Sequence, residues 1–281
     1  MKGAWKWGAP LLLLAALEGW GSHPAMARQA LTIKGSDTMV ILGQRWAEQF
    51  ARKNPDIAVQ VTGGGSGSGI AALINGTTDI AEASRPMTAQ ERALARQRRG
   101  KEVHEFVVAK DGVTVYVNEA NPVEALTVDQ LRGIFTGRIR RWSEVGGLDQ
   151  PIIVYSREHN SGTYVFFREH VMQNEDYTPR AQTMPGTAAL VNAVARTPNG
   201  IGFGGIAYAH GVRAVRIRAH EGAPAVAPSL ETVRNGTYPL SRPLYWYTLG
   251  EPGPLARQLL DWVLSDEGQA VVAEVGYIPL R

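Results

Sequence analysis

The sequence contains no cysteine, no long apolar segment and almost no excess of charge. Without cysteine it has no disulfide, no thiolate nucleophile and no cysteine-based metal site. It also lacks the Cys that a lipid-anchored secreted protein needs, so we expect a protein that is free in its compartment. The apolar run from Pro10 to Leu17 is far shorter than the roughly 20 residues of a membrane-spanning helix, and no later segment is long enough.

The first 27 residues are typical of a secretory leader that is removed from the mature protein. Lys2 and Lys6 give a positive start, the short apolar run follows, and Ala25-Met26-Ala27 supplies a small-x-small cleavage signal. We therefore expect cleavage after Ala27 and a periplasmic location. The alternative is an uncleaved membrane anchor, which the length of the apolar run disfavours.

The small net charge argues against a nucleic-acid partner. The sequence holds 29 basic and 26 acidic residues, or 27 and 25 without the leader, which leaves +2. One dense basic run, Arg92 to Lys101, has two interpretations: a nucleic-acid or membrane patch, or a solvated helix face that follows the capping box Thr88-x-x-Glu91. We favour the helix face, because no aromatic residues interleave the charges as single-strand binders require.

Strands and helices alternate along the chain, which predicts an α/β fold with layers around largely parallel sheets. Alternating apolar residues indicate strands, and apolar residues at three- and four-residue spacing indicate helices. Asn75-Gly76 and the Thr127-x-x-Gln130 capping box predict one helix end and one helix start. The expected elements are strands at 31–33, 57–61 and 152–155, and helices that begin near Met39, after 69, near Thr127 and at 164.

Two segments are long enough to cross between domains, and the 254 residues after the leader suffice for two. AKDGVTVYVN, near 110–118, predicts one crossing strand, and RPLYWYTLG at 242–250 predicts the return. This pairing predicts a discontinuous first lobe, 28–112 with 242–281, and a second lobe, 113–241.

Three loops share one composition: each follows an expected strand, is rich in Gly, Ser and Thr, and opens a helix. They are GSDT at 35–38, GGGSGSG at 63–69 and NSGT at 160–163. A helix start exposes unpaired N–H groups and the positive end of a dipole, which favour an anion. One such loop is weak evidence, since Ser and Thr are ordinary N-caps. Three loops, with Arg85 and Arg157 expected beside them as unpaired cations, predict an anion site.

Motifs for enzymes and cofactors fail on their spacing. No Lys follows the glycine-rich loop as a P-loop requires, and Ser68 stands where a hydrolase elbow around Ser66 needs glycine. GFGGIA at 202–207 lacks the downstream acidic partner of a dinucleotide loop, so we expect a strand followed by a turn. The five histidines after the leader form no metal-ligand pair. We therefore expect no metal, no cofactor and no enzymatic activity.

At this point the residues resemble a known family. KGSDTM, GGGSGSGI, TDIAEASRPM, IFTGRIRRWSEVGG and SREHNSGTYVFF occur in this order. They resemble the phosphate-binding proteins of the phosphate-specific ABC transporter, the PstS family, from about Leu31 to the C-terminus. The resemblance implies a two-lobed type II periplasmic binding protein with two crossing hinge strands. It also implies that a monomer captures inorganic phosphate in the cleft and delivers it to the permease subunits of the transporter.

The resemblance carries a set of phosphate-binding positions over to this sequence. Two positions depart from the better-known members. Arg85 replaces an Asp that accepts a hydrogen bond from protonated phosphate, and an Arg cannot accept one. Selectivity against sulfate must then rest elsewhere; Asp37 is the candidate, unless it is only the N-cap of the first helix. His159 replaces an acidic residue that orients Arg157. The positions are Ser36, Asp37, Thr38, Ser66 and Arg85 in the first lobe, and Arg157, Ser161, Gly162 and Thr163 in the second.

Other functions stay open at this stage. The nearest alternative is a protein that binds another oxyanion, such as sulfate, molybdate or tungstate. A phosphatase or phosphate-transfer enzyme would need a metal or an activated nucleophile, and the sequence indicates neither. A secreted adhesion or signalling protein that reuses the fold is a third possibility.

Overall fold

The computed structural model describes residues 29–281, and the leader predicted for 1–27 lies outside them. Strands and helices alternate as expected. From the N-terminus the elements are β1 (Gln29–Gly35), α1 (Val40–Lys53), β2 (Ile57–Thr62), α2 (Ser66–Asn75), β3 (Ile80–Ala83), α3 (Ala89–Arg99), β4 (Val103–Val117), β5 (Ala125–Thr127), α4 (Val128–Thr136), the 3-10 turn η1 (Trp142–Val145), β6 (Ile153–Arg157) and α5 (Gly162–His170). There follow β7 (Gln182–Met184), α6 (Gly186–Arg196), β8 (Gly200–Gly205), the 3-10 turn η2 (Ile206–Tyr208), β9 (Arg213–Ala214), β10 (Arg216–Arg218), α7 (Leu230–Arg234), β11 (Ser241–Leu249), α8 (Pro254–Val263) and α9 (Asp266–Val275).

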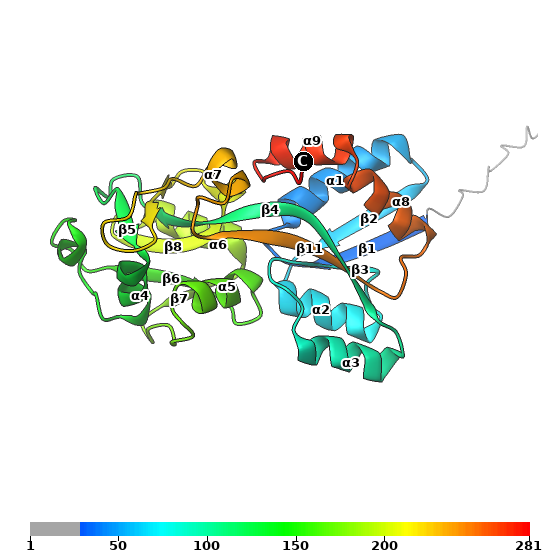
Figure 1. The fold of residues 1–281 in the computed structure, drawn as a ribbon, viewed down its shortest axis with the longest axis horizontal. Helices are drawn as coiled ribbons and strands as arrows, with labels where there is room; N and C mark the ends of the chain where they lie inside the picture. The colour runs from blue at the N-terminus through cyan, green and yellow to red at the C-terminus, as the bar shows by residue number, and fades with distance from the viewer. Residues whose placement is uncertain (1–28) are drawn as a thin grey trace, which may run out of the picture.

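The two predicted crossing strands are confirmed as β4 and β11, which pair antiparallel and run from one half of the molecule to the other (Figure 1). Strand β4 pairs with β11 up to Gly112 and with β8 from Val113 onward. The sheet order β2-β1-β3-β11-β4-β8-β6-β7 therefore continues through both halves. The first lobe holds β1 to α3, β11, α8 and α9; the second holds β5 to α7; β4 belongs to both.

Each lobe has its own apolar core between its sheet and its helices. In the first lobe, α1, α8 and α9 lie on one face of the sheet and α2 and α3 on the other (Figure 1). Trp46 of α1 and Trp246 of β11 meet edge to face there, with ring centroids 5.3 Å apart. In the second lobe, Phe167 of α5 stacks on Phe203 of β8 at 4.2 Å. Burial of each such ring contributes about 1.5–3 kcal/mol, so each lobe carries substantial stability of its own.

The ends of the helices follow the local signals in the sequence. The hydroxyls of Thr88 and Thr127 accept from the backbone N–H of Glu91 and Gln130, the third residues of α3 and α4. The side chains of Glu91 and Gln130 in turn accept from the backbone N–H of Thr88 and Thr127, so both predicted capping boxes are confirmed. Helix α2 ends at Gly76 in the left-handed conformation, as predicted. Helix α5 begins at Gly162, two residues earlier than predicted, because the Ser161 hydroxyl caps it by accepting from Tyr164 N.

The basic run and the second glycine motif also take the structures that the sequence favoured. Arg92 and Arg96 lie on α3 and pair with Glu105 and Glu102, so the run is a solvated, ion-paired helix face. The segment at 202–207 is strand β8 followed by the turn η2. Within residues 29–281 no helix has the length and apolar character needed to span a bilayer. The same residues contain no group of three His, Cys, Asp or Glu side chains placed to hold a metal ion.

Candidate functional site

The three glycine-rich loops meet where the two lobes face each other. GSDT leads from β1 toward α1, GGGSGSG joins β2 to α2, and NSGT joins β6 to α5. Gly67 N donates to Asn160 O at 2.9 Å, and the Asn160 amide donates to Gly64 O and Ser68 Oγ, each at 2.9 Å. The start of α2 therefore touches the loop before α5. Since the first N–H groups of a helix have no partner within it, two helix starts present donors at one place.

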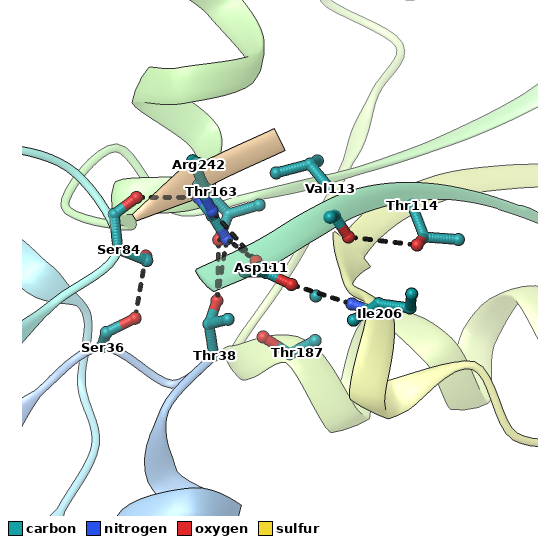
Figure 2. A network of polar contacts seen from close by, with 12 residues as sticks. Ser36, Thr38, Ser84, Asp111, Val113, Thr114, Thr163, Thr187, Ile206 and Arg242 are labelled. Atoms are coloured by element: carbon teal, nitrogen blue, oxygen red, sulfur yellow. Dashed lines mark hydrogen bonds and ion pairs between the residues drawn. The ribbon is translucent and has the colours of Figure 1, made fainter. Parts of the chain in front are cut away.

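A cluster of buried hydroxyls lies beside these helix starts (Figure 2). Ser36 Oγ donates to Ser84 Oγ at 2.8 Å, and Ser66 Oγ accepts from Ser84 N at 3.0 Å. Between the lobes, the Thr38 and Thr163 hydroxyls are 2.8 Å apart. All five side chains are at most 2% exposed. Because water is excluded, hydrogen bonds that these groups give to a ligand are stronger than they would be at the surface.

Arg157, on β6, is 2% exposed and bonded on three sides to protein groups. Its Nη2 donates to Asp37 Oδ2 at 2.7 Å, its Nη1 to Thr187 Oγ1 at 2.9 Å, and its Nε to Glu158 Oε2 at 3.2 Å. The expectation that Arg157 is unpaired is therefore wrong. His159 cannot supply the carboxylate that orients this Arg in better-known members of the family. Glu158 and, from the other lobe, Asp37 supply carboxylates to Arg157 instead.

Asp37 connects the two lobes rather than capping a helix. Its Oδ1 accepts from Gly64 N at 2.9 Å, and its Oδ2 accepts from Arg157. The start of α1 receives no side-chain cap, so the alternative in which Asp37 is the N-cap of α1 is wrong. A carboxylate offers about four lone-pair positions, and two are used here. Asp37 thus keeps the capacity to accept a hydrogen bond from a protonated oxygen.

Arg85 also has a partner, contrary to expectation. Its Nη1 and Nη2 donate to Glu91 Oε2 and Oε1 at 2.9 and 2.7 Å, which places the guanidinium at the start of α3. Burial acts to raise the pKa of Glu91, but hydrogen bonds from Arg85 and Thr88 outweigh it and hold that pKa below its usual range. The pair is therefore ionised at neutral pH. A contact between Arg85 and a bound anion stays a prediction.

Gly162 lies where the second lobe meets the first. A Cβ at this position would stand 2.4 Å from Ser66 Oγ and 2.7 Å from Ser84 Oγ, closer than side chains tolerate. The Ser161 hydroxyl accepts from Tyr164 N at 3.3 Å, which leaves its proton available for a bond to a ligand. The backbone at the start of α5 therefore approaches the hydroxyl cluster directly.

Sequence reasoning missed Arg242, Asp111 and Ser84. Arg242, on β11, donates through Nε and Nη2 to Asp111 Oδ2 at 3.0 and 2.8 Å, and through Nη1 to Ser84 O at 2.9 Å (Figure 2). Arg242 is 4% exposed and Asp111 is fully buried. The available signal was the charge within each predicted crossing strand: Arg242 in RPLYWYTLG, and the adjacent Lys110 and Asp111 in AKDGVTVYVN. Paired charges are the usual form in which such residues are buried.

Glu82, on β3, is a further acidic group close to the site. It is fully buried, and its carboxyl oxygens have no hydrogen-bond partner within residues 29–281, although the Trp246 side chain lies beside them. Burial, and next the negative charge of Asp37, raise the pKa of Glu82 well above its usual range. Burial thus favours the neutral form of Glu82, which adds no charge to the site.

Comparison with known proteins places this geometry in a family. The profile of the PBP superfamily domain matches residues 21–267. The phosphate-binding protein PstS of Pseudomonas aeruginosa is 35% identical over 267 residues, which cover 89% of this chain and 83% of that protein. PstS of Staphylococcus epidermidis is 32% identical, over 87% of this chain and 77% of the relative.

A solved structure agrees in fold as well as in sequence. It is a phosphate ABC transporter substrate-binding protein from Clostridium perfringens, with bound phosphate. It is 32% identical to this chain, covers 90% of it and is itself covered completely, with a TM-score of 0.82. The two lobes and the crossing strands are thus those of a type II periplasmic binding protein. The chain belongs to the PBP superfamily and, within it, to the family of the PstS phosphate-binding proteins.

Proposed function

We propose that this protein captures inorganic phosphate between its two lobes and delivers it to the membrane subunits of an ABC uptake transporter. The observation that carries the proposal is the meeting of two helix starts, α2 and α5, at a buried hydroxyl cluster to which both lobes contribute. Such helix starts bind anions through free N–H groups and the helix dipole. The PstS relatives and the phosphate-bound structure from C. perfringens support phosphate as the anion.

We propose that the protein binds phosphate mainly by donating hydrogen bonds to it, and not through unpaired positive charge. Two guanidinium groups, Arg157 and Arg242, stand against the carboxylates of Asp37, Glu158 and Asp111. Each charge-assisted hydrogen bond contributes ~1.5–3 kcal/mol, and micromolar affinity corresponds to about −8.2 kcal/mol. A few such bonds therefore suffice after anion desolvation and lobe ordering are subtracted. The proposed phosphate-binding residues are Ser36, Asp37, Thr38, Ser66, Arg85, Arg157, Ser161, Gly162 and Thr163.

We propose that the two lobes, 28–112 with 242–281 and 113–241, close on phosphate by bending β4 and β11. The change of β4 partner between Gly112 and Val113 supports this hinge position. The separation of the apolar cores supports it too. Phosphate would favour the closed form because only that form brings donors from both lobes to it.

The relatives are named as binding proteins, not enzymes. We infer that this chain likewise catalyses no reaction, and that a cleaved leader directs it as a monomer to the periplasm.

The proposal is tested by native mass spectrometry of the purified protein, followed by calorimetric titration with phosphate, sulfate, molybdate and tungstate. We expect bound phosphate, preference for it over the other anions, and a smaller radius of gyration on titration. At a hundredfold excess over Kd, phosphate should stabilise the fold by ~2.7 kcal/mol. Preference for another anion, or turnover of a phosphate ester by the purified protein, would overturn the assignment.

A further inference from the structure

Arg242 contacts both lobes from its position on a hinge strand. On the first-lobe side it donates to Ser84 O at 2.9 Å, and it lies opposite Asp111 of β4, its cross-strand neighbour. On the second-lobe side, Nη2 donates to Thr163 Oγ1 at 2.9 Å (Figure 2). The guanidinium carbon also lies over the Phe166 ring, 5.3 Å from the ring centroid. No other function in the site has been assigned to this side chain.

The hydrogen bond from Arg242 determines what the Thr163 hydroxyl can do. A hydroxyl has one proton and two acceptor positions, while a guanidinium can only donate. Arg242 therefore occupies one acceptor position of Thr163. Thr38 and Thr163 share one further bond at 2.8 Å, in which either can be the donor. In both arrangements one of the two hydroxyl protons is left over, and it is available to an anion.

The contacts of Arg242 differ in which state of the hinge they require. Asp111 and Ser84 O lie on the crossing strand and in the first lobe, and stay beside Arg242 when the lobes part. Thr163 and Phe166 belong to α5 and move away with the second lobe. The Arg242 guanidinium, held by Asp111 and Ser84 O, thus contacts Thr163 and Phe166 only in the closed form. These two contacts therefore stabilise the closed form relative to the open one.

We propose that Arg242 is a positioning residue for anion capture: held by Asp111, it fixes the Thr163 hydroxyl as a hydrogen-bond donor and favours the closed form. This inference rests on the proposed function, because it assigns Arg242 a part in phosphate binding. Arg242 would act on the ligand indirectly, by orienting the Thr163 hydroxyl, and would not contact the ligand itself. A purely structural ion pair would stabilise the fold without any link to that hydroxyl.

The test is a double-mutant cycle on phosphate affinity in the full mature chain. Thr163→Ala is measured alone and in the Arg242→Gln/Asp111→Asn background, which removes both charges and leaves no buried carboxylate without its cation. Arg242→Lys is a second background: it keeps the charge but replaces the planar fork of donors, which reaches Asp111, Ser84 O and Thr163 together, with a single ammonium nitrogen. Arg213→Gln is the matched control, because Arg213 also donates to second-lobe carbonyls, including Val123 O at 2.7 Å.

We expect Thr163→Ala to weaken phosphate binding about tenfold to a hundredfold in the wild type. In both Arg242 backgrounds the same substitution should cost less than about threefold, because its donor is no longer oriented. In the Arg213→Gln background the full loss should return. The Arg242 backgrounds, saturated with phosphate, should also have a larger radius of gyration than the wild type.

Two results would overturn the inference, and they are distinguishable. If wild-type protein binds phosphate but the losses in the Arg242 backgrounds equal the wild-type loss, Arg242 is only structural and the proposed function stands. If wild-type protein does not bind phosphate, both the proposed function and this inference fail. Should the charge-neutral background not fold, the lysine background alone decides whether the loss caused by Thr163→Ala depends on Arg242.

Discussion

Replacing Asp37 with Asn removes one charge from the ion pair that joins the two lobes. Asp37 Oδ2 and Arg157 Nη2 are 2.7 Å apart, and their side chains are 19% and 1% exposed. Asn has the same size and keeps an oxygen for the bond from Gly64 N. Asp37 does not cap α1, so no loss of a helix cap complicates the result. The perturbation is therefore confined to the charge and to one acceptor.

The size of the effect on lobe closure and on anion selectivity follows from two roles of Asp37: it pairs with Arg157, and it can accept a hydrogen bond from a protonated anion. A hydrogen bond between charged groups contributes ~1.5–3 kcal/mol, so the closed form should lose about tenfold to a hundredfold against the open form when no anion is bound. Phosphate carries a proton that a carboxylate can accept, whereas sulfate carries none and meets Asp37 as a like charge. Asp37→Asn should therefore raise sulfate affinity relative to phosphate by about tenfold.

Calorimetric titration with both anions at neutral pH measures this ratio, and small-angle scattering without anion measures the closed population. Asp79→Asn is the matched control, since Asp79 is another first-lobe carboxylate and, within residues 29–281, its side chain accepts only from Thr32. The control should leave the ratio unchanged. If Asp37→Asn also leaves it unchanged, Asp37 is not the group that separates the two anions, and the reasoning is refuted.

Three further predictions follow from neighbouring residues. Gly162→Ala should weaken phosphate binding at least tenfold with little change in the stability of the anion-free protein, because the new methyl group would meet Ser66 Oγ at 2.4 Å in the closed form; equal affinity by calorimetry would contradict this. Burial raises the pKa of Glu82, so its stabilising effect is complete below the usual pKa of about 4.3 and is lost as pH rises toward the folded value. Glu82→Gln should flatten the decline of Tm with pH above that point, and an unaltered slope in thermal melts would count against it. Arg85→Ala should lower Tm at neutral pH by removing the partner of Glu91, and it should weaken phosphate binding about tenfold to a hundredfold by removing a charge-assisted hydrogen bond; an affinity that stays within about threefold would show that Arg85 acts only through Glu91.

Much of the fold and the outline of the site could be predicted because their signals are local. A capping box such as Thr88-x-x-Glu91 spans four residues, and each glycine-rich loop shows its helix start within one turn. The crossing strands were visible because each contains a long run of apolar and aromatic residues, VTVYV in β4 and LYWY in β11. Strands β5, β7, β9 and β10 have only two or three residues, too few to show a period.

The partners of the charged side chains could not be predicted, because they depend on which segments the fold brings together. Arg157 and Asp37 are 120 positions apart, and Arg242 and Asp111 are 131 apart. The sequence places Arg242 and Asp111 on the two crossing strands but does not give the register that sets them opposite each other, and no local pattern connects Arg157 with Asp37. Arg85 is different: its partner Glu91 lies six residues away and was already recognised as part of a capping box, so this pair was within reach of the sequence.

The place of β11 in the sheet sets the order in which the chain can fold during synthesis. Strand β11 lies between β3 and β4, yet it is made after residues 113–240, which contain an apolar cluster of their own. A growing chain can therefore complete the second lobe while the first still has two exposed strand edges, a state prone to wrong pairing. The sheet of the first lobe is complete only when residues 241–281 have been made and β11 inserts between β3 and β4. The intervening residues 113–240 form a long connection, which slows this pairing step. The C-terminal segment, made last, then binds a segment near the N-terminus that was made early, since the Tyr277 hydroxyl donates to Thr38 O.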